Sequence, residues 1–246
     1  MGSQPRLNLS RRIGRFRWDR TAIGLLCLLA MLAGAHGWLL LHPEHDPRAP
    51  LDLDHPVGWA TQAKLDALQG NPAICREVLD RSNIAFSALP SAGEGACLRQ
   101  DRTRLADFPL SPDVPPVSCP TAVALVLWQR DTVQPAAQSI FGQDVASIGH
   151  LGAFSCRRLY GRSTGPWSEH ATANAIDIAG FTLADGTQIS VLRDWDSAGK
   201  KARFLRRVRD GACESFATTL SPDYNAAHAD HFHLDQQARS WGRVCR

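Results

Sequence analysis

A run of 22 residues without a charged side chain, Thr21–His42 (TAIGLLCLLAMLAGAHGWLLLH), most constrains what this chain can fold into. An α-helix needs about 20 apolar residues to cross the hydrocarbon core of a bilayer. Six arginines lie within the first 20 residues, and only Asp19 opposes their charge. Because arginines mark the cytoplasmic end of a span, we expect the N-terminus in the cytoplasm and the rest of the chain outside.

A cleaved signal peptide is the alternative reading of this run. Ala33-Gly34-Ala35 resembles a cleavage site. The apolar residues continue past it through Trp38 to Leu41, which favours an uncleaved signal anchor. We therefore predict a single-pass inner-membrane protein, with residues 21–42 in the inner membrane, the N-terminus cytoplasmic and the C-terminal domain periplasmic.

The charge of the chain is concentrated in the N-terminal tail. The first 20 residues carry +5 and the whole chain +3, which leaves residues 21–246 at −2. A nucleic-acid-binding domain carries a basic surface, so the body is not expected to bind nucleic acid. Hydrophobic residues make up 44% of the chain, which indicates a folded body rather than disorder.

Cysteine usage agrees with export. Cys27 lies in the apolar run, and six further cysteines follow it. An even number of cysteines outside a membrane indicates three disulfides, for which 15 pairings are possible. We predict the pairs Cys75–Cys97, Cys156–Cys213 and Cys119–Cys245.

Hydrophobic spacing divides the body into helical and extended stretches. Residues 61–82, 120–142 and 198–220 have helical spacing. Residues 144–160, 175–195 and 231–235 have the character of strands, and Asp185-Gly186 is a hairpin turn signal. We therefore predict an α+β fold: a small antiparallel sheet with helices packed on it, preceded by one transmembrane helix.

This organisation divides the chain into five parts. They are a basic cytoplasmic tail (1–20), a transmembrane signal anchor (21–42), a linker (43–54), a helical N-terminal part of the body (55–117) and an α+β domain (118–246).

Two short stretches of the body concentrate chemically active residues. In SEHATANAIDIAGF (168–181) a carboxylate, Asp177, lies between Ile176 and Ile178, where a buried charge needs a partner. In HADHFHLD (228–235) His231 and His233 are at i and i+2, so a strand would place both on one face. His170, Asp177 and His233 form a set of two histidines and one carboxylate. Such a set suits Zn²⁺ and leaves a fourth position for water, the expected nucleophile.

The two stretches also resemble a known family. With SCR upstream and LSPDYNAAH leading into the second stretch, they are similar to the bacterial extensin-like C-terminal domain family over residues 50–246. More distantly they resemble zinc D-alanyl-D-alanine metallopeptidases, lysostaphin-like endopeptidases and hedgehog-type domains, which share Ser-x-His-x-x-Gly-x-Ala-x-Asp followed by His-x-His. Ala173 stands where that group has glycine, so the turn is expected to differ slightly. The resemblance implies that His170, Asp177 and His233 are the zinc ligands. It also implies that the α+β domain, residues 118–246, is similar to zinc hydrolases, with the zinc site at the sheet.

The wider group places the proton carrier at either of two positions, and this chain fills both, with Asp230 and His231. We favour His231, with Asp230 close behind. Arg157 resembles an arginine that related carboxypeptidases place against a substrate carboxylate or oxyanion; its alternative is a surface charge beside a disulfide. We expect supporting roles around the metal for His228 and Asp235, a structural role for His150, and a hydrogen bond from Ser168 to the metal loop.

The resemblance thus implies a zinc-dependent hydrolase of peptidoglycan peptide stems that cuts amide bonds near D-amino acids. The alternative is a non-catalytic, zinc-stabilised envelope module that binds the cell wall or a protein. The presence of Asp230 and His231 beside the ligands favours the enzyme. A third reading, a disulfide-held envelope protein without metal, gives Asp177 no role. The sequence leaves endopeptidase and carboxypeptidase activity undecided.

Overall fold

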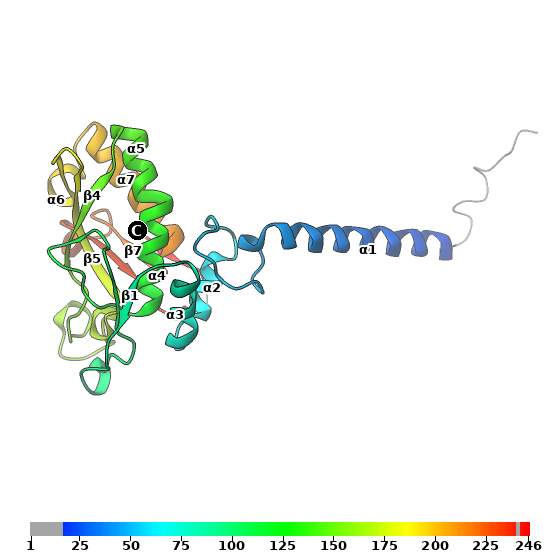
Figure 1. The fold of residues 1–246 in the computed structure, drawn as a ribbon, viewed down its shortest axis with the longest axis horizontal. Coiled ribbons are helices and arrows are strands. Elements are labelled where there is room, and N and C mark those ends of the chain that lie inside the picture. Colours follow the sequence, from blue (N-terminus) through cyan, green and yellow to red (C-terminus); the bar gives the residue numbers. More distant parts are fainter. Residues whose placement is uncertain (1–16, 240–241) are drawn as a thin grey trace, which may run out of the picture.

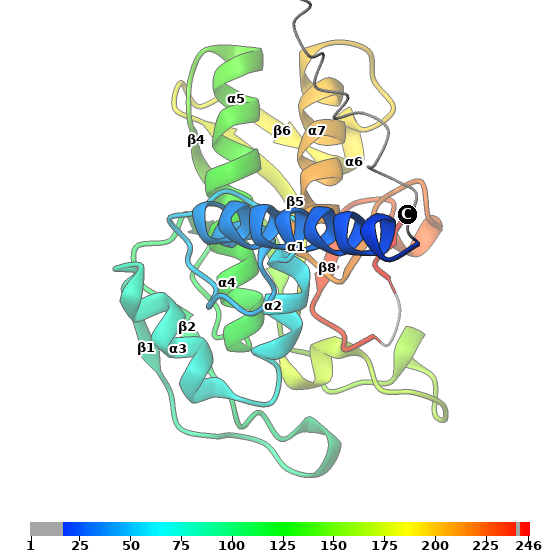
Figure 2. The same cartoon turned by 90° about the vertical axis from the view of Figure 1, so that its right-hand side faces the viewer.

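The computed structural model describes residues 17–239 and 242–246, so most of the predicted basic tail lies outside the described residues. Helix α1, Arg17–Leu41, extends from the folded body as a single long rod (Figures 1 and 2). It is long and apolar enough to cross a membrane, and its apolar stretch is not buried against the body. The predicted helix is therefore present, while its orientation across a membrane stays a prediction.

The chain enters the body through two short helices. The 3₁₀ turn η2 (Pro43–His45) is followed by α2 (Thr61–Ala67) and α3 (Pro72–Arg81). Asn71 caps α3, because its side chain accepts a hydrogen bond from the backbone N–H of Ile74. Pro72 follows at the first helical position, where its missing N–H costs nothing. Asn71 and Pro72 together explain why a new helix, α3, begins here instead of α2 continuing.

A small hairpin follows α3. Strands β1 (Phe86–Ala88) and β2 (Thr103–Leu105) pair antiparallel, with the 3₁₀ turn η3 (Gly95–Cys97) between them. Leu51, Leu53, Leu65 and Leu105 belong to the same buried cluster as the helices and strands of residues 118–246. The proposed division of the chain into parts stays a prediction.

The principal helices are α4 (Cys119–Trp128), α5 (Gln134–Phe141) and α7 (Lys200–Ser215), with a short α6 (Val191–Asp194). Every residue of α4 is buried. A π-helical segment, Gln129–Val133, joins α4 to α5, and Pro135 follows directly. Because proline donates no backbone hydrogen bond, it favours such a local change of helix type.

The sheet has seven strands in the described part of the chain. Its order is β3-β4-β5-β8-β7-β9, and β6 pairs with β5. The strands are β3 (Leu110–Ser111), β4 (Val145–Gly152), β5 (Ala175–Leu183), β6 (Gln188–Ser190), β7 (Thr218–Leu220), β8 (Phe232–Asp235) and β9 (Val244–Cys245). The central pairs are antiparallel, as predicted, but the pairs β3–β4 and β7–β9 are parallel. The sheet is therefore mixed, and the prediction of a purely antiparallel sheet was wrong at its two edges. The edge strands β3 and β9 have two residues each, which is too short for an alternating hydrophobic pattern in the sequence.

One face of the sheet is covered by helices. Helices α4, α5 and α7 lie between the sheet and α1 in both views (Figures 1 and 2). Ile176 and Ile178 of β5 belong to the core on this face. Side chains alternate along a strand, so Asp177 points to the opposite face. The helices thus leave one sheet face free for a site.

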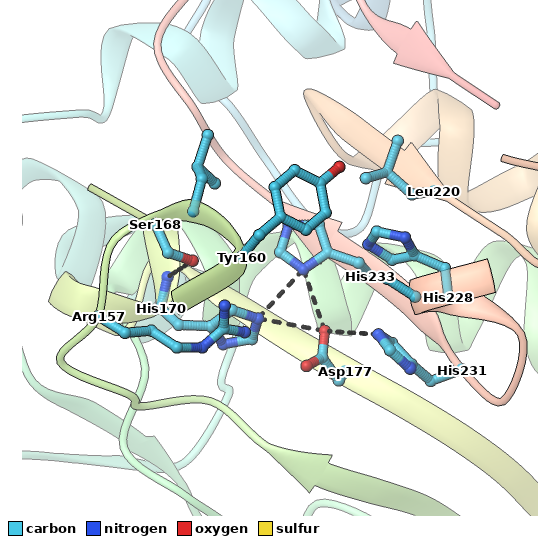
Figure 3. A pocket seen from close by; sticks show the side chains of 11 residues that line it. Arg157, Tyr160, Ser168, His170, Asp177, Leu220, His228, His231 and His233 are labelled. Carbon is cyan, nitrogen blue, oxygen red and sulfur yellow. Dashed lines mark hydrogen bonds and ion pairs between the residues drawn. The ribbon is translucent and has the colours of Figure 1, made fainter. Parts of the chain in front are cut away.

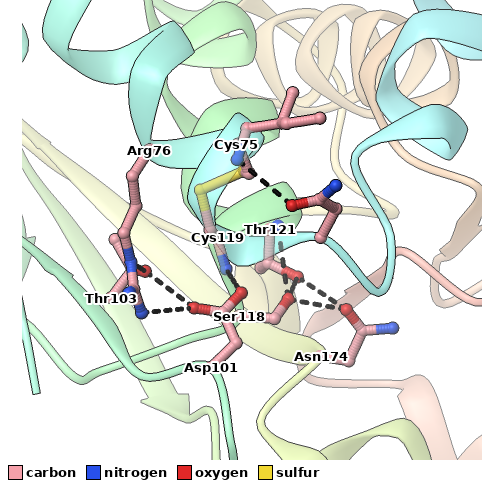
Figure 4. The surroundings of a disulfide bond; sticks show 10 residues. Cys75, Arg76, Asp101, Thr103, Ser118, Cys119, Thr121 and Asn174 are labelled. Carbon is pink, nitrogen blue, oxygen red and sulfur yellow. Dashed lines mark hydrogen bonds and ion pairs between the residues drawn. A yellow bond between two sulfur atoms is a disulfide. The ribbon is translucent and has the colours of Figure 1, made fainter. Parts of the chain in front are cut away.

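Three disulfides connect the six cysteines of the body, as expected, but every predicted pairing is wrong. The bonds are Cys75–Cys119, Cys97–Cys156 and Cys213–Cys245. The first joins α3 to the start of α4, where both cysteines are fully buried (Figure 4). Pairing follows contacts between elements distant in sequence, and the spacing of cysteines does not contain that information. Cys27 is free and exposed on α1.

The bond between Cys97 and Cys156 should contribute strongly to stability because it closes a long loop. Replacing both cysteines by serine is expected to lower the free energy of unfolding by about 2–4 kcal/mol, mainly because the unfolded chain without the crosslink gains conformational entropy. Denaturant unfolding of the full chain in detergent measures this. Cys27→Ser is the control and should leave the value unchanged. An unchanged stability of the double variant would contradict the pairing, as would a different partner of Cys97 in non-reduced peptide mapping.

Candidate metal centre

Three side chains from separate elements meet on the free face of the sheet (Figure 3). Asp177 of β5 and His233 of β8 are directly opposite each other in the antiparallel pair. His170 comes from the 3₁₀ turn η6 (Glu169–Thr172) and is 3% exposed. Asp177 Oδ1 lies 3.2 Å from His170 Nε2 and 3.0 Å from His233 Nδ1, and the two imidazole nitrogens are 3.1 Å apart. The predicted ligand set therefore forms one group.

The outer ring nitrogens of both histidines are committed to other partners. His170 Nδ1 lies 3.0 Å from the carbonyl oxygen of Ala153 and must donate its proton there. His233 Nε2 donates to the carboxylate of Asp235 over 2.9 Å. When both rings are neutral, the inner nitrogens therefore present lone pairs to each other and to the Asp177 carboxylate.

Three acceptor atoms within 3.2 Å of one another repel unless a cation lies among them. A neutral imidazole whose other nitrogen donates to a carboxylate or carbonyl is the usual form of a histidine metal ligand. Nitrogen and carboxylate donors suit Zn²⁺. The residues present thus fit a zinc ion.

The electrostatics of the group agree with this reading. Burial raises the pKa of Asp177, but the imidazoles of His170 and His233 within hydrogen-bonding distance outweigh it and lower that pKa well below its usual range. Burial lowers the pKa of His233, yet its hydrogen bonds to Asp177 and Asp235 prevail and raise the pKa to about 9. In the metal-free protein a proton on His233 therefore supplies the missing positive charge.

The loop that carries His170 is held by a polar network. Ser168 Oγ accepts a hydrogen bond from the backbone N–H of His170, as predicted. Ala173, which replaces the glycine of the wider group, adopts the left-handed conformation that glycine favours (φ 56°). Asn174 then accepts from Ser118 Oγ over 2.6 Å (Figure 4). Its Nδ2 donates to Glu169 over 2.7 Å. Burial raises the pKa of Glu169.

Both candidate proton carriers lie beside the group. Strand β8 begins at Phe232, so His231 and Asp230 precede it. His231 Nε2 is 3.6 Å from Asp177 Oδ1, while its Nδ1 is 2.7 Å from the exposed carboxylate of Asp230. Asp230 therefore lies behind His231 and orients the ring.

A cavity of about 350 Å³ opens onto the group (Figure 3). Arg157, His231 and His228 line it, as do Tyr160 and Leu220, which the sequence analysis missed. Arg157 is exposed, and within the described part of the chain no carboxylate pairs with its guanidinium.

Asn225, also missed, joins two walls of this cavity. Its Oδ1 accepts from the backbone N–H of Ala227 and from His228 Nδ1, and its Nδ2 donates to the Tyr160 hydroxyl. His228 is mostly buried, and burial lowers its pKa to about 4, so it is neutral near pH 7. Its polar contact is thus with Asn225 rather than with a candidate ligand.

His150 lies apart from the group. Its Nε2 donates to the carbonyl oxygen of Asp113 over 3.0 Å. Asp235, in contrast, takes the supporting position expected of it, behind His233. The sequence did contain a signal for Asn225, because asparagine in LSPDYNAAH is a typical turn residue before a histidine. No motif or residue spacing indicated Tyr160.

The fold and this set of residues define a mixed α+β domain with a candidate metal centre. The chain belongs to the family described as extensin-like protein C-terminus, whose model matches residues 73–246. No curated protein and no solved structure matches this chain.

Asp235 should tune metal affinity because it fixes the tautomer of His233. Asp235→Asn is expected to weaken zinc binding by about 10–100-fold, the usual effect of removing such a partner. Zinc competition with a chelator on the full chain in detergent measures this. Asp113→Asn, an aspartate beside His150, is the matched control and should bind zinc normally. Equal affinities of the two variants would contradict the orienting role of Asp235.

Zinc binding should depend on pH because the metal displaces the proton of His233. The folded pKa of about 9 exceeds the ordinary value of 6.5, so protonation stabilises the metal-free fold below pH 6.5, and this contribution is lost as pH rises through about 9. Zinc affinity of the folded chain should therefore rise with pH up to about 9, by up to about tenfold per pH unit, and then level off. Chelator competition at several pH values tests this; an affinity that does not change with pH would contradict it.

Proposed function

We propose that this chain is a zinc-dependent hydrolase of peptidoglycan peptide stems that cuts amide bonds near D-amino acids. Helix α1 would anchor it in the inner membrane, with the N-terminal arginines in the cytoplasm and the body in the periplasm. One observation carries the proposal: three acceptor atoms, on His170, Asp177 and His233, face one another at the floor of a cavity.

His170, Asp177 and His233 would hold the metal. A bound Zn²⁺ lowers the pKa of water toward about 7 and polarises a carbonyl group. The ligand atoms need little rearrangement for this, because the Ala153 carbonyl and the Asp235 carboxylate already fix both imidazole rings.

His231 is the group that moves the proton in this proposal. Its Nδ1–H is held by Asp230, so Nε2 presents a lone pair toward the metal group. As water adds to the amide carbon, Nε2 accepts a proton from it. The same proton then passes to the leaving nitrogen as the carbon–nitrogen bond breaks, which yields a carboxylate and an amine.

Arg157 would bind the negative charge of the substrate. Its guanidinium lines the cavity and has no carboxylate partner among the described residues. A free guanidinium is suited to a substrate carboxylate or to the oxygen that gains charge during attack. This contact would favour stems that end in a carboxylate near the cut bond.

The substrate class derives from the resemblance of the two motifs to peptidoglycan peptidases, and family membership alone names no activity. A non-catalytic zinc module remains the competing function. It would need the three ligands but neither His231 nor Asp230, and the bond between these two residues favours the hydrolase.

The roles of ligand and proton carrier can be separated by substitution. His233→Ala should lose both zinc and activity. His231→Ala keeps all three ligands, so zinc should remain while turnover falls by about 10²–10⁴-fold. Asp230→Ala should be milder, because it removes only the group that orients His231. Zinc content and release of peptide products from isolated peptidoglycan are the measurements.

His150→Ala is the matched control, since this histidine lies outside the group, and it should retain zinc and turnover if it folds. Loss of zinc from His231→Ala would show that the ligand assignment is wrong. Zinc-loaded wild-type protein that releases no product from peptidoglycan would support the non-catalytic module instead.

A further inference from the structure

The segment between α1 and α2 is bound to the body from its first residues. Lys64 Nζ donates to the carbonyl oxygen of Pro43 over 2.6 Å. The backbone N–H of Ala60 donates to the carbonyl oxygen of Glu44 over 3.3 Å. At Gly58 an added Cβ would lie 2.3 Å from that same carbonyl oxygen, so the two stretches of backbone are in close contact. We call residues 43–60 the collar.

Three hydrogen bonds also tie the collar to two helical parts of the body, α3 and the π-helical segment. The backbone N–H of Leu53 donates to Ser82 Oγ after α3. Arg81 of α3 donates to the carbonyl oxygen of Leu51. Arg130, in the π-helical segment, donates to the carbonyl oxygen of His55. Since Leu51 and Leu53 are buried in the core, the collar cannot act as a freely moving tether.

Aromatic rings join the collar to the last turn of α1. Trp38 of α1 stacks on His45, with ring centroids 5.2 Å apart and planes within 7°. Trp59 contacts the same imidazole at 4.3 Å and lies 5.7 Å from Trp38. The backbone N–H of Trp59 donates to His45 Nδ1. Yet Trp59 remains 79% exposed, although its side chain is the largest apolar one in the collar.

We propose that Trp59 and Trp38 lie together in the interfacial layer of the bilayer, so that the collar docks the body onto the membrane surface. The inference rests on the proposed crossing of the membrane by α1. Tryptophan is enriched at this layer, where its ring is apolar and its N–H remains hydrated. Trp38 is three residues from the end of α1, at the depth where such a belt is expected, and Trp59 is held beside it.

The docked collar gives the metal centre a fixed orientation. Helices α4, α5 and α7 lie between the sheet and α1 (Figures 1 and 2). Asp177 and His233 alternate with core residues along β5 and β8, so their side chains are on the other sheet face. The cavity therefore faces away from the bilayer. A body on a loose tether would reach a substrate in any orientation, whereas this one presents its site to material beyond the membrane surface.

Depth-dependent fluorescence quenching tests the proposal. The full chain is reconstituted in phosphatidylcholine vesicles with acyl chains brominated near the headgroup, near the middle or not at all. The signal of Trp59 is the difference between wild type and Trp59→Phe. It should lose most of its intensity with bromines near the headgroup, less with bromines in mid-chain, and little with aqueous iodide. Trp167→Phe is the matched control: Trp167 is an exposed tryptophan beside Arg158, and iodide alone should quench its signal.

Two further measurements separate this proposal from the crossing itself. Alkaline extraction of the vesicles reports whether α1 spans the membrane, and a C-terminal alkaline phosphatase fusion reports the side of the body. A chain that resists extraction but whose Trp59 is quenched only by iodide overturns the docking and leaves the crossing intact. A chain that extraction removes overturns both.

Discussion

The repulsion among His170 Nε2, Asp177 Oδ1 and His233 Nδ1 is the constraint on which the rest of the body depends. Backbone pairing of β5 with β8 places Asp177 and His233 opposite each other. The Ala153 carbonyl and Asp235 hold the outer N–H of each imidazole, so a neutral ring presents a lone pair inward. Holding these three acceptor atoms together therefore costs the folded state free energy. Such an arrangement is stable only around positive charge, which a proton on His233 supplies in the metal-free protein and zinc would supply in the loaded one.

Support for this arrangement comes from the N-terminal part of the body. Asp101 accepts hydrogen bonds from Arg76 and Thr103 and from the backbone N–H of Cys119 at the start of α4 (Figure 4). The disulfide between Cys75 and Cys119 closes the same junction. From there the contact of Ser118 with Asn174 leads to the metal loop. The region before residue 118 therefore positions the candidate site, although it contributes no ligand.

The sequence predicted the parts of this structure that have a local signal. The period of 3.6 marked α7, the turn Asp185-Gly186 marked the hairpin of β5 and β6, and Asp177 among isoleucines marked the site. The disulfide pairing failed, because it depends on which elements pack together. Tyr160 and Asn225 were missed for the same reason: they meet across a cavity whose walls are 65 residues apart in the sequence. The parallel pairs β3–β4 and β7–β9 were missed because β3 and β9, with two residues each, are too short for a recognisable alternation of apolar and polar residues.

The number of ligands distinguishes the two candidate functions on physical grounds. A structural zinc site is closed by four protein ligands, while a catalytic site keeps one position open. Within the described residues the group of mutually close donors comprises three, His170, Asp177 and His233. His231 lies outside that group, with Nδ1 engaged by Asp230 and Nε2 beside Asp177. The cavity opens at this same point. A cavity and a positioned imidazole beside a group of three donors would admit water and substrate to a bound metal, which favours the proposed hydrolase over a closed, purely structural metal site.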